Sequence, residues 1–331
     1  MNSTSLPVFF HLLADRKLMP GAARLVFEAD SLEALSALAT QTDFAALVAG
    51  LPCLIAAEQA PGLPPELLAG LLAAGCVVTA KSAIHHADEQ LKPVLPATAQ
   101  WLDGHWMLAP PQRPSSAQTA SRTLALKLLQ LVMADAETRD IEAVLRQDPT
   151  LSYHLLRLVN SLGMGMTRRI TSFSQAILIL GRNQLRRWLN LMLFAARSDD
   201  HRAPMLLAKV VVRARTMELL AKDRGQDRAD QDLAFMAGMF SMLGVLFGMS
   251  LADLIKPLQL SEVLVDAVIS HQGDFGCLLQ LLEQAEQGDM AGAAGLLTGL
   301  QLTPAQFTLA NLAACQWMLD IAREVKGGGH D

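Results

Sequence analysis

The sequence has little charge, few aromatic residues and few cysteines, and each scarcity argues against a class of protein. Only 18% of the 331 residues are charged while 51% are hydrophobic, so the chain can form a core and is not intrinsically disordered. Aromatic residues make up 5%, with a single tyrosine, which argues against the stacking surfaces of nucleic-acid binders. The four cysteines include no CxxC pair, which argues against a disulfide framework or a thiolate metal site. We expect Cys53, Cys76, Cys277 and Cys315 to be small buried apolar residues.

Long apolar runs are also missing. Charged or polar residues interrupt every such run before the roughly 20 residues that a membrane-spanning helix needs. The start, Met1 to Leu6, lacks the basic-then-apolar pattern of a signal peptide. We therefore expect a cytoplasmic protein without membrane insertion, long enough for two domains of roughly 100 to 200 residues.

The small net charge of −5 hides an uneven distribution of charge along the chain. Residues 1–110 carry a balance of −5, residues 111–228 a balance of +9, and residues 229–331 a balance of −9. Such opposite segments can pair within a domain, between protomers or with partners.

Three prolines and two serines in residues 109–116 cannot continue a helix or a central strand, and they mark a domain boundary. We expect an α/β domain at 1–110, a linker at 111–120, an all-α domain at 121–325 and a flexible tail at 326–331. In the first domain, strand-length apolar runs alternate with helical stretches at 31–39 and 64–74, which predicts a largely parallel sheet. The expected strands are 6–13, 23–29, 52–57, 76–80 and 106–109.

The pattern after the boundary predicts helices throughout. Apolar residues recur at helical spacing, and caps or helix-breaking residues separate the segments. The expected helices cover residues 123–134, 141–147, 149–160, 172–180, 183–196, 203–223, 231–248, 261–270, 277–287 and 303–325. About ten helices with short connections form a compact helical domain.

Three stretches of this helical half resemble the HDOD domain, a bacterial signalling relative of the HD phosphohydrolases. They are residues 146–161 (RQDPTLSYHLLRLVNS), 170–181 (ITSFSQAILILG) and 235–244 (FMAGMFSMLG). The continuation at 182–189 (RNQLRRWL) resembles the subfamily in which HDOD follows a degenerate EAL domain. The resemblance implies that the first domain is a truncated EAL remnant, because 110 residues are too few for the complete barrel. Motif residues with expected structural roles are Asp148, Pro149, Asn160, Ser161, Gly181, Trp188 and Gly238.

The resemblance also locates a lost metal centre. HD hydrolases use a His-Asp pair and further ligands to hold metal ions, but Ser241 and Met242 stand where that pair would be. A neutral hydroxyl is a poor ligand for a hard metal, and a thioether suits soft metals. In the first domain, His85 and His86 are adjacent, and Glu28 ends an expected strand. The histidine pair and Glu28 are better explained as exposed polar positions than as metal ligands. We therefore expect no metal, no cofactor and no catalytic residue.

Five arginines crowd two helix ends: Arg168, Arg169, Arg182, Arg186 and Arg187. Three interpretations stay open for them. They can form a solvated or internally paired surface, dock an acidic protein or the first domain, or bind nucleic acid. The acidic total and the scarcity of aromatic residues argue against the last.

The sequence thus predicts a two-domain α+β protein that is not an enzyme. We expect a bacterial signal-transduction protein that acts through contacts with signalling or regulatory proteins, or with its own copies as a homo-oligomer. Two alternatives stay open. One is a cyclic di-GMP-linked phosphodiesterase or phosphohydrolase with atypical ligands, and the other is a receptor that binds a nucleotide without turnover.

Overall fold

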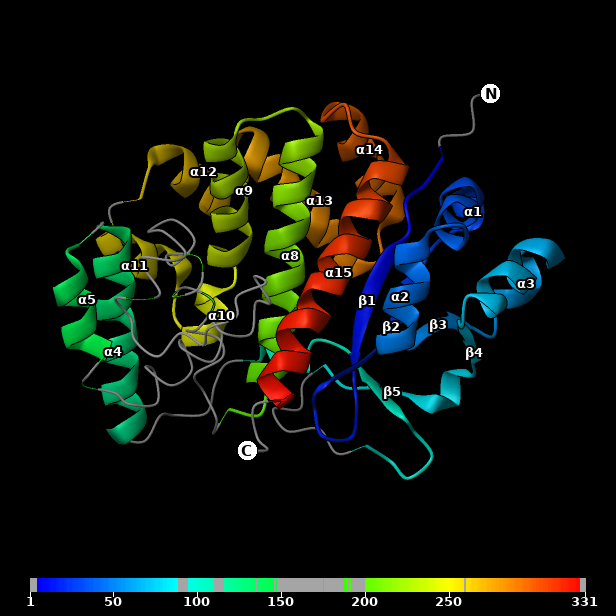
Figure 1. Cartoon of the computed structure of the whole chain (residues 1–331), viewed down its shortest axis with the longest axis horizontal. Helices are drawn as coiled ribbons and strands as arrows, with labels where there is room; N and C mark the ends of the chain where they lie inside the picture. The colour runs from blue at the N-terminus through cyan, green and yellow to red at the C-terminus, as the bar shows by residue number, and fades with distance from the viewer. Residues whose placement is uncertain are drawn as a thin grey trace.

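A mixed β-sheet with flanking helices is followed by a helical region (Figure 1). The computed structural model describes residues 5–88, 95–109, 116–134, 136–145, 147, 175, 187, 189, 191, 200–258 and 260–327. Within these residues the α/β region followed by helices confirms the predicted fold class.

Six strands form one sheet in the order β4-β3-β2-β1-β6-β5. Their bounds are β1 Phe9–Ala14, β2 Pro20–Val26, β3 Cys53–Ala56, β4 Val77–Thr79, β5 Ile84–His86 and β6 Trp101–Asp103. The pairs β2–β3, β3–β4 and β5–β6 are parallel, whereas β1 is antiparallel to both β2 and β6. The short turn between β1 and β2 enforces that hairpin, and the side chain of Asp15 accepts hydrogen bonds from Lys17 N and Met19 N there. The sheet is therefore mixed, where the sequence predicted a largely parallel one.

The strand predicted at 106–109 is wrong. Residues Trp106–Leu108 form a 3₁₀ turn, and the last strand is β6, just before it. The helices of this region are α1 Leu32–Ala39, α2 Thr42–Gly50 and α3 Pro65–Ala73. The predicted helices at 31–39 and 64–74 correspond to α1 and α3, whereas α2, β5 and β6 were not predicted.

The region after the sheet is helical as predicted wherever it is described, although α11 and α14 were not predicted and α4 begins within the predicted linker. Its helices are α4 Ser116–Met133, α5 Thr138–Leu145, α8 Ala203–Asp223, α9 Arg228–Phe240, α10 Leu243–Phe247, α11 Leu251–Ile255, α12 Glu262–Ser270, α13 Gly273–Gln287, α14 Met290–Gly299 and α15 Pro304–Gly327. The helix predicted at 231–248 is divided at Ser241 and Met242 into α9 and α10. The predicted helices at 149–160, 172–180 and 183–196 lie outside the described residues, apart from a few isolated positions.

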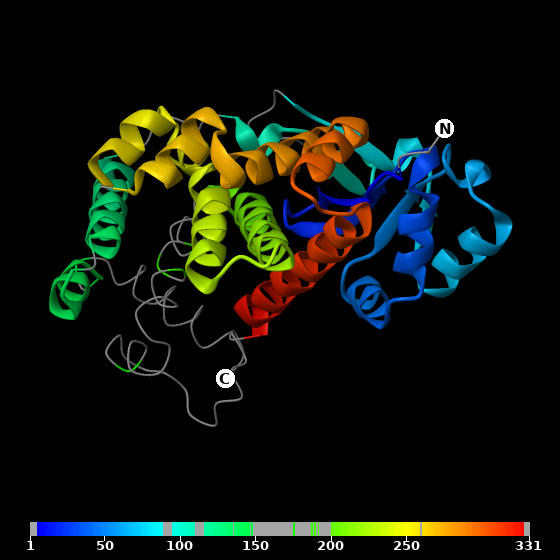
Figure 2. The ribbon, with the colours of Figure 1, turned by 90° about the horizontal axis from the view of Figure 1, so that it is seen from above.

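The sheet and the helices share one hydrophobic core. Helix α15 lies against β1 and α2, and both ribbon views show it between the sheet and the other helices (Figures 1 and 2). Where β1 is not paired with β6, Val8 N donates to Thr308 Oγ1 (3.0 Å) and Phe10 N to Asn311 Oδ1 (2.9 Å). Side chains of α15 therefore satisfy main-chain donors along β1 that no neighbouring strand reaches.

A second link joins the end of the first region to the start of α8. The guanidinium of Arg202, which is fully buried, donates to the carbonyl of Ala109 and to the carboxylate of Asp200. The ring of Trp106 stacks on that of His201, with centroids 6.2 Å apart. These contacts hold residues 106–109, which come just before the predicted linker, against the helical region.

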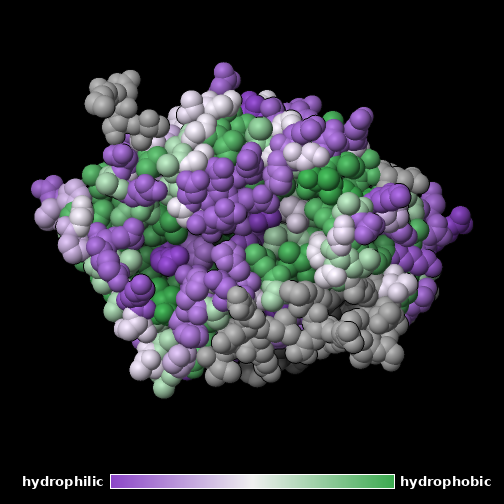
Figure 3. All heavy atoms as spheres, turned by 180° about the vertical axis from the view of Figure 1, so that it is seen from behind, coloured by the Kyte–Doolittle hydropathy of each residue, from purple (hydrophilic) through white to green (hydrophobic). Residues whose placement is uncertain are grey.

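The molecular surface alternates between polar and apolar zones. Figure 3 shows a hydrophilic band across the rear face with hydrophobic patches on either side of it. Within the described residues no single helix is long and apolar enough to cross a membrane. Only a bent pair of segments, residues 228–247 with 251–258, meets that requirement together, by length and composition alone.

Candidate functional site

Helices α8 and α9 approach each other closely because Gly238 has no side chain. A Cβ placed on Gly238 would lie 2.7 Å from the Cα of Ala214, closer than packed atoms allow. This contact holds the end of α9, where Ser241 follows, against the middle of α8. The predicted structural role of Gly238 therefore has a geometric basis.

The guanidinium of Arg213 contacts Ser241, one of the two residues that the HD resemblance puts in the place of metal ligands. Arg213 comes from α8 and is 5% exposed. Its Nη1 donates to Ser241 Oγ at 2.7 Å, and its Nε and Nη2 donate to the two carboxylate oxygens of Glu286 at 2.9 and 2.6 Å. Glu283 on α13 lies 3.7 Å from Nη1. A permanent cation therefore contacts the hydroxyl that replaces the expected metal-binding histidine.

A second cation completes this group of charges. Lys209, one turn before Arg213 on α8, lies with its Nζ 2.9 Å from Glu286 Oε2. Burial raises the pKa of Glu286, but the charges and hydrogen bonds of Arg213 and Lys209 outweigh it and lower the pKa to about 2. The same carboxylate raises the pKa of Arg213 against the opposing effect of burial. The group therefore keeps Arg213 and Glu286 charged near neutral pH.

The residues at this centre do not fit the metal ions of an HD hydrolase. Ser241 Oγ already donates to Gly238 O (2.7 Å) and accepts from Arg213, while Met242 is buried in the core. Because a guanidinium is effectively always protonated, it would repel a divalent cation placed beside it. In the described ranges, no three His, Cys, Asp or Glu side chains are arranged to hold a metal ion.

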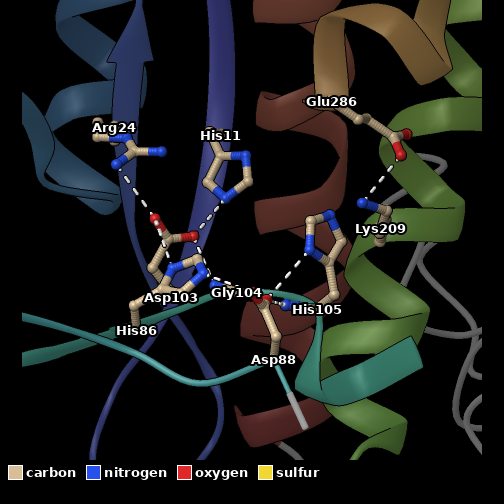
Figure 4. A network of polar contacts seen from close by, with 9 residues as sticks. All are labelled: His11, Arg24, His86, Asp88, Asp103, Gly104, His105, Lys209 and Glu286. Carbon is tan, nitrogen blue, oxygen red and sulfur yellow. Dashed lines mark hydrogen bonds and ion pairs between the residues drawn. The ribbon is translucent and has the colours of Figure 1, made fainter. Parts of the chain in front are cut away.

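Another polar cluster lies on the sheet, around Asp103 at the end of β6. Its Oδ1 contacts His11 Nε2 at 2.7 Å, and its Oδ2 lies 3.1 Å from Arg24 Nη1 (Figure 4). Burial raises the pKa of Asp103, but the hydrogen bond with His11 and the charge of Arg24 hold it well below its usual range. Asp103 therefore connects β1, β2 and β6 through charged hydrogen bonds.

Asp88, just beyond β5, is the exposed partner of this cluster. It contacts His86 Nε2 at 2.8 Å and His105 Nδ1 at 3.2 Å, and it accepts a hydrogen bond from His105 N at 2.7 Å. That main-chain bond, followed by the bond with His86, lowers the pKa of Asp88.

A cleft separates the sheet cluster from the Lys209–Glu286 pair, which face each other in Figure 4. It is narrow and partly open to solvent. Its lining is mostly apolar, and His11, His105, Lys209 and Glu286 are the titratable residues that line it. The cleft therefore adjoins the Arg213 centre through Glu286, which belongs to both.

The structure places one of the five clustered arginines. Arg187 is 7% exposed, lies 2.5 Å from Glu218 Oε2 and 3.4 Å from Asp232 Oδ1, and stacks over the ring of Phe235. It thus follows the internally paired interpretation and is not exposed for docking. Predicted site residues outside the described residues are Arg168, Arg169, Arg182, Arg186, Asp148, Pro149, Asn160, Ser161, Gly181 and Trp188.

The remaining predicted positions are ordinary. Glu28 is exposed and belongs to a capping box with Ser31. Cys53, Cys76 and Cys315 are buried as expected, and their burial raises the pKa of each thiol, whereas Cys277 is only partly buried. Charges of the basic middle and acidic last segments do pair within the helical region, as in Arg213–Glu286 and Arg224–Asp274.

Comparison with known families bears on the helical region. Residues 120–261 match the family model of the HDOD domain. The chain contains an HDOD domain. The Arg213–Ser241 contact lies inside the matched residues, whereas Glu286 and α15 lie beyond them. The match does not identify the sheet region as an EAL domain, and its EAL origin stays a prediction.

Two curated relatives match about half of this chain. A 175-residue stretch, 52% of the chain, is 29% identical to the uncharacterized protein YuxH of Bacillus subtilis. A 185-residue stretch, 55% of the chain, is 32% identical to the cyclic di-GMP phosphodiesterase CdgJ of Vibrio cholerae. Each match covers 42% of the relative's own length. A solved structure from Shewanella amazonensis aligns over 61% of this chain and 93% of its own, with a TM-score of 0.41 and 16% identity. That score is too low to support a conclusion.

The importance of Arg213 and Asp103 was missed from the sequence. A signal for the first exists, since Lys209 and Arg213 are four residues apart and share a helix face otherwise rich in valine and alanine. Two cations on an apolar helix predict buried acidic partners. No comparable signal marks Asp103, because its partners come from distant strands.

Proposed function

We propose that this protein is a non-catalytic regulator in bacterial signalling, whose HDOD domain acts through contacts with other proteins. The observation that carries the proposal is the Arg213 guanidinium, which is hydrogen-bonded to Ser241 and Glu286 where an HD hydrolase would hold its metal. A water-activating centre needs open coordination positions on a metal ion. Here the equivalent space holds a charged side chain whose hydrogen bonds are directed at protein groups.

A second candidate is a protein that hydrolyses or binds cyclic di-GMP. The name of the Vibrio cholerae relative favours it, since that protein is a cyclic di-GMP phosphodiesterase. The match covers less than half of that relative, so its activity belongs to this chain only as a hypothesis. In this candidate the cleft lined by His11, His105 and Lys209 is the surface where the nucleotide would bind, because it offers nitrogen donors for a phosphate.

Turnover of cyclic di-GMP separates the two candidates. The purified full-length protein is incubated with cyclic di-GMP and either Mg²⁺ or Mn²⁺, and the products are separated by chromatography. The non-catalytic proposal predicts no linear dinucleotide above the level of a protein-free control. Turnover that Lys209→Ala abolishes and that Glu66→Gln, an exposed change on α3, leaves intact would overturn the proposal in favour of an enzyme.

Calorimetry with cyclic di-GMP then separates a receptor from a protein that ignores the nucleotide. Saturable heat without turnover, lost in Lys209→Ala, would support the receptor. Absence of heat would leave protein contacts as the mode of action.

Capture of partners by the immobilised full-length protein, repeated with Arg186→Glu/Arg187→Glu, tests the predicted docking arginines. Because Arg187 is buried, the folding of this variant is checked by circular dichroism. The same capture experiment is also run with Arg168→Glu/Arg169→Glu.

A further inference from the structure

One edge of the sheet combines an exposed strand with an almost uncharged sequence. Strand β4 is the last strand on this side, and α3 precedes it directly. In residues 59–80 the only charged residue is Glu66. Leu72 on α3 is 43% exposed, and Val77 and Val78 in β4 are 50% and 39% exposed. Both ribbon views place α3 at the end of the molecule away from α4 and α5 (Figures 1 and 2).

The main-chain groups of β4 leave a defined pairing position. Thr79 O accepts from Ala57 N at 3.0 Å, so Thr79 faces the β3 side of the strand. Successive residues of a strand direct their N–H and C=O groups to opposite sides, which turns those of Val78 outward. Val77 and Val78 are exposed on the two faces of the strand, and no described strand pairs with its outer side.

The opposite edge of the sheet is protected in the usual way. Strand β5 carries His85 and His86, and His86 is held by Asp88. Polar or charged residues on an edge strand discourage pairing with another chain. Strand β4 has no charged residue, its outward-facing Val78 is apolar, and the nearest charge after it in the chain is Lys81, so the two edges differ in how open they are to a partner.

We propose that the β4 edge is the dimer interface of this protein, with β4 of a second copy pairing antiparallel to it about a two-fold axis at Val78. In an interface that repeats itself across a two-fold axis, a charge that lies beside the axis is close to its own copy. A patch with almost no charge meets its copy without this repulsion, and Leu72, Val77 and Val78 of both copies lose their exposure to water. Pairing joins two six-stranded sheets into one continuous sheet.

The proposed register makes a testable distinction between neighbouring residues. In a hydrogen-bonded antiparallel pair the two Cα atoms lie about 5.5 Å apart, which is within the range that a disulfide bridges. The two copies of Val78 form that pair. The two copies of Val77 lie on a diagonal of about 7–8 Å, which is too far for a disulfide without movement of the backbone.

Mass and cross-linking together test the proposal. Light scattering of the wild-type chain is expected to give twice the single-chain mass of 35.7 kDa. Val78→Lys is expected to give the single-chain mass. Val263→Lys, at a position 55% exposed on α12, is expected to keep the dimer. Under mild oxidation, Val78→Cys is expected to form a covalent dimer that Val77→Cys and the wild type do not form.

Two outcomes would overturn the proposal. A wild-type chain with the single-chain mass at every concentration would mean that the edge does not join two copies. A dimer that persists in Val78→Lys, together with no covalent dimer in Val78→Cys, would place the interface elsewhere. Circular dichroism melting of each variant checks that the fold is intact. We expect an intact fold because the substituted positions are exposed.

Discussion

Arg213 on α8 donates a 2.7 Å hydrogen bond to Ser241 at the end of α9, and the same guanidinium forms a two-point ion pair with Glu286. The contact joins Ser241, at an expected metal-ligand position, to a charge held within the protein. The HDOD domain thus has an internal cation at the place where its hydrolytic relatives are expected to bind a metal.

Loss of Glu286 should be costly. In Glu286→Gln the cations of Arg213 and Lys209 keep their burial but lose their shared carboxylate, and breaking a buried pair in this way costs about 3–5 kcal/mol of unfolding free energy. Urea unfolding measures the change. The exposed Glu66→Gln serves as the control and should change stability by less than about 0.5 kcal/mol. A Glu286→Gln protein as stable as the control would contradict the described pairing.

Replacing both partners should restore much of that loss. In a Lys209→Met background, Arg213→Met/Glu286→Leu removes the buried charges together, and such replacements are often neutral or stabilising by about 1–4 kcal/mol relative to the intact pair. A double-mutant cycle with the two single variants gives the coupling energy. Additive effects of the two changes would show that the residues do not interact.

Acid should destabilise the protein through the same carboxylate. The pKa of Glu286 is lowered from 4.5 to about 2 in the folded protein. Its stabilising contribution is therefore present above the unfolded value of 4.5 and is lost as the pH falls from 4.5 towards 2. Unfolding curves across this window should show a smaller loss of stability in Glu286→Gln than in the wild type. Parallel pH profiles for the two proteins would be inconsistent with this assignment.

Asn311 should tie the sheet to the HDOD domain. It is fully buried, accepts from Phe10 N at 2.9 Å and donates to Thr216 Oγ1 at 3.3 Å. Asn311→Ala leaves the Phe10 N–H buried without a partner, at a cost of about 1–3 kcal/mol. Hydrogen exchange should show faster exchange of the Phe10 amide. Thr298→Ala removes only a bond within α14, and unchanged exchange at Phe10 is expected there.

Two glycine substitutions should have opposite effects. In Gly238→Ala the new methyl group meets the Cα of Ala214 at 2.7 Å, and forcing α8 and α9 apart costs about 1–3 kcal/mol. Gly295 lies in α14, and a Cβ added there would meet no atom within 4 Å, so Gly295→Ala should stabilise by up to about 1 kcal/mol. Thermal melting compares the two. Equal melting temperatures would argue against the close approach of α8 and α9.

The sequence predicted those parts of the fold that depend on local pattern. The 21 residues of α8 match the predicted helix 203–223, because its proline start and apolar periodicity are local signals. Strands β5 and β6 were missed because each has three residues, too few for an alternating pattern. The division of the predicted helix 231–248 was missed because neither Ser241 nor Met242, where it occurs, is a strong helix breaker.

The candidate site could be predicted only in part. Ser241 and Met242 were located through the family resemblance; Ser241 accepts a hydrogen bond from Arg213, and Met242 is buried in the core. The acidic partners of Arg213, Glu283 and Glu286, come from α13, far later in the chain. Such pairings depend on how helices pack, which a single sequence does not encode locally. The grouping of His11, Arg24 and Asp103 depends in the same way on strand order.

We propose that the guanidinium of Arg213 stands in the HDOD domain where an HD hydrolase holds its metal. Elemental analysis of the full-length protein, purified without chelator and dialysed against Mn²⁺ and then metal-free buffer, tests this proposal, with cyclic di-GMP turnover measured on the same sample. Much less than one metal ion per chain and no turnover are expected. One or two tightly held metal ions per chain, together with hydrolysis of cyclic di-GMP, would overturn the proposal.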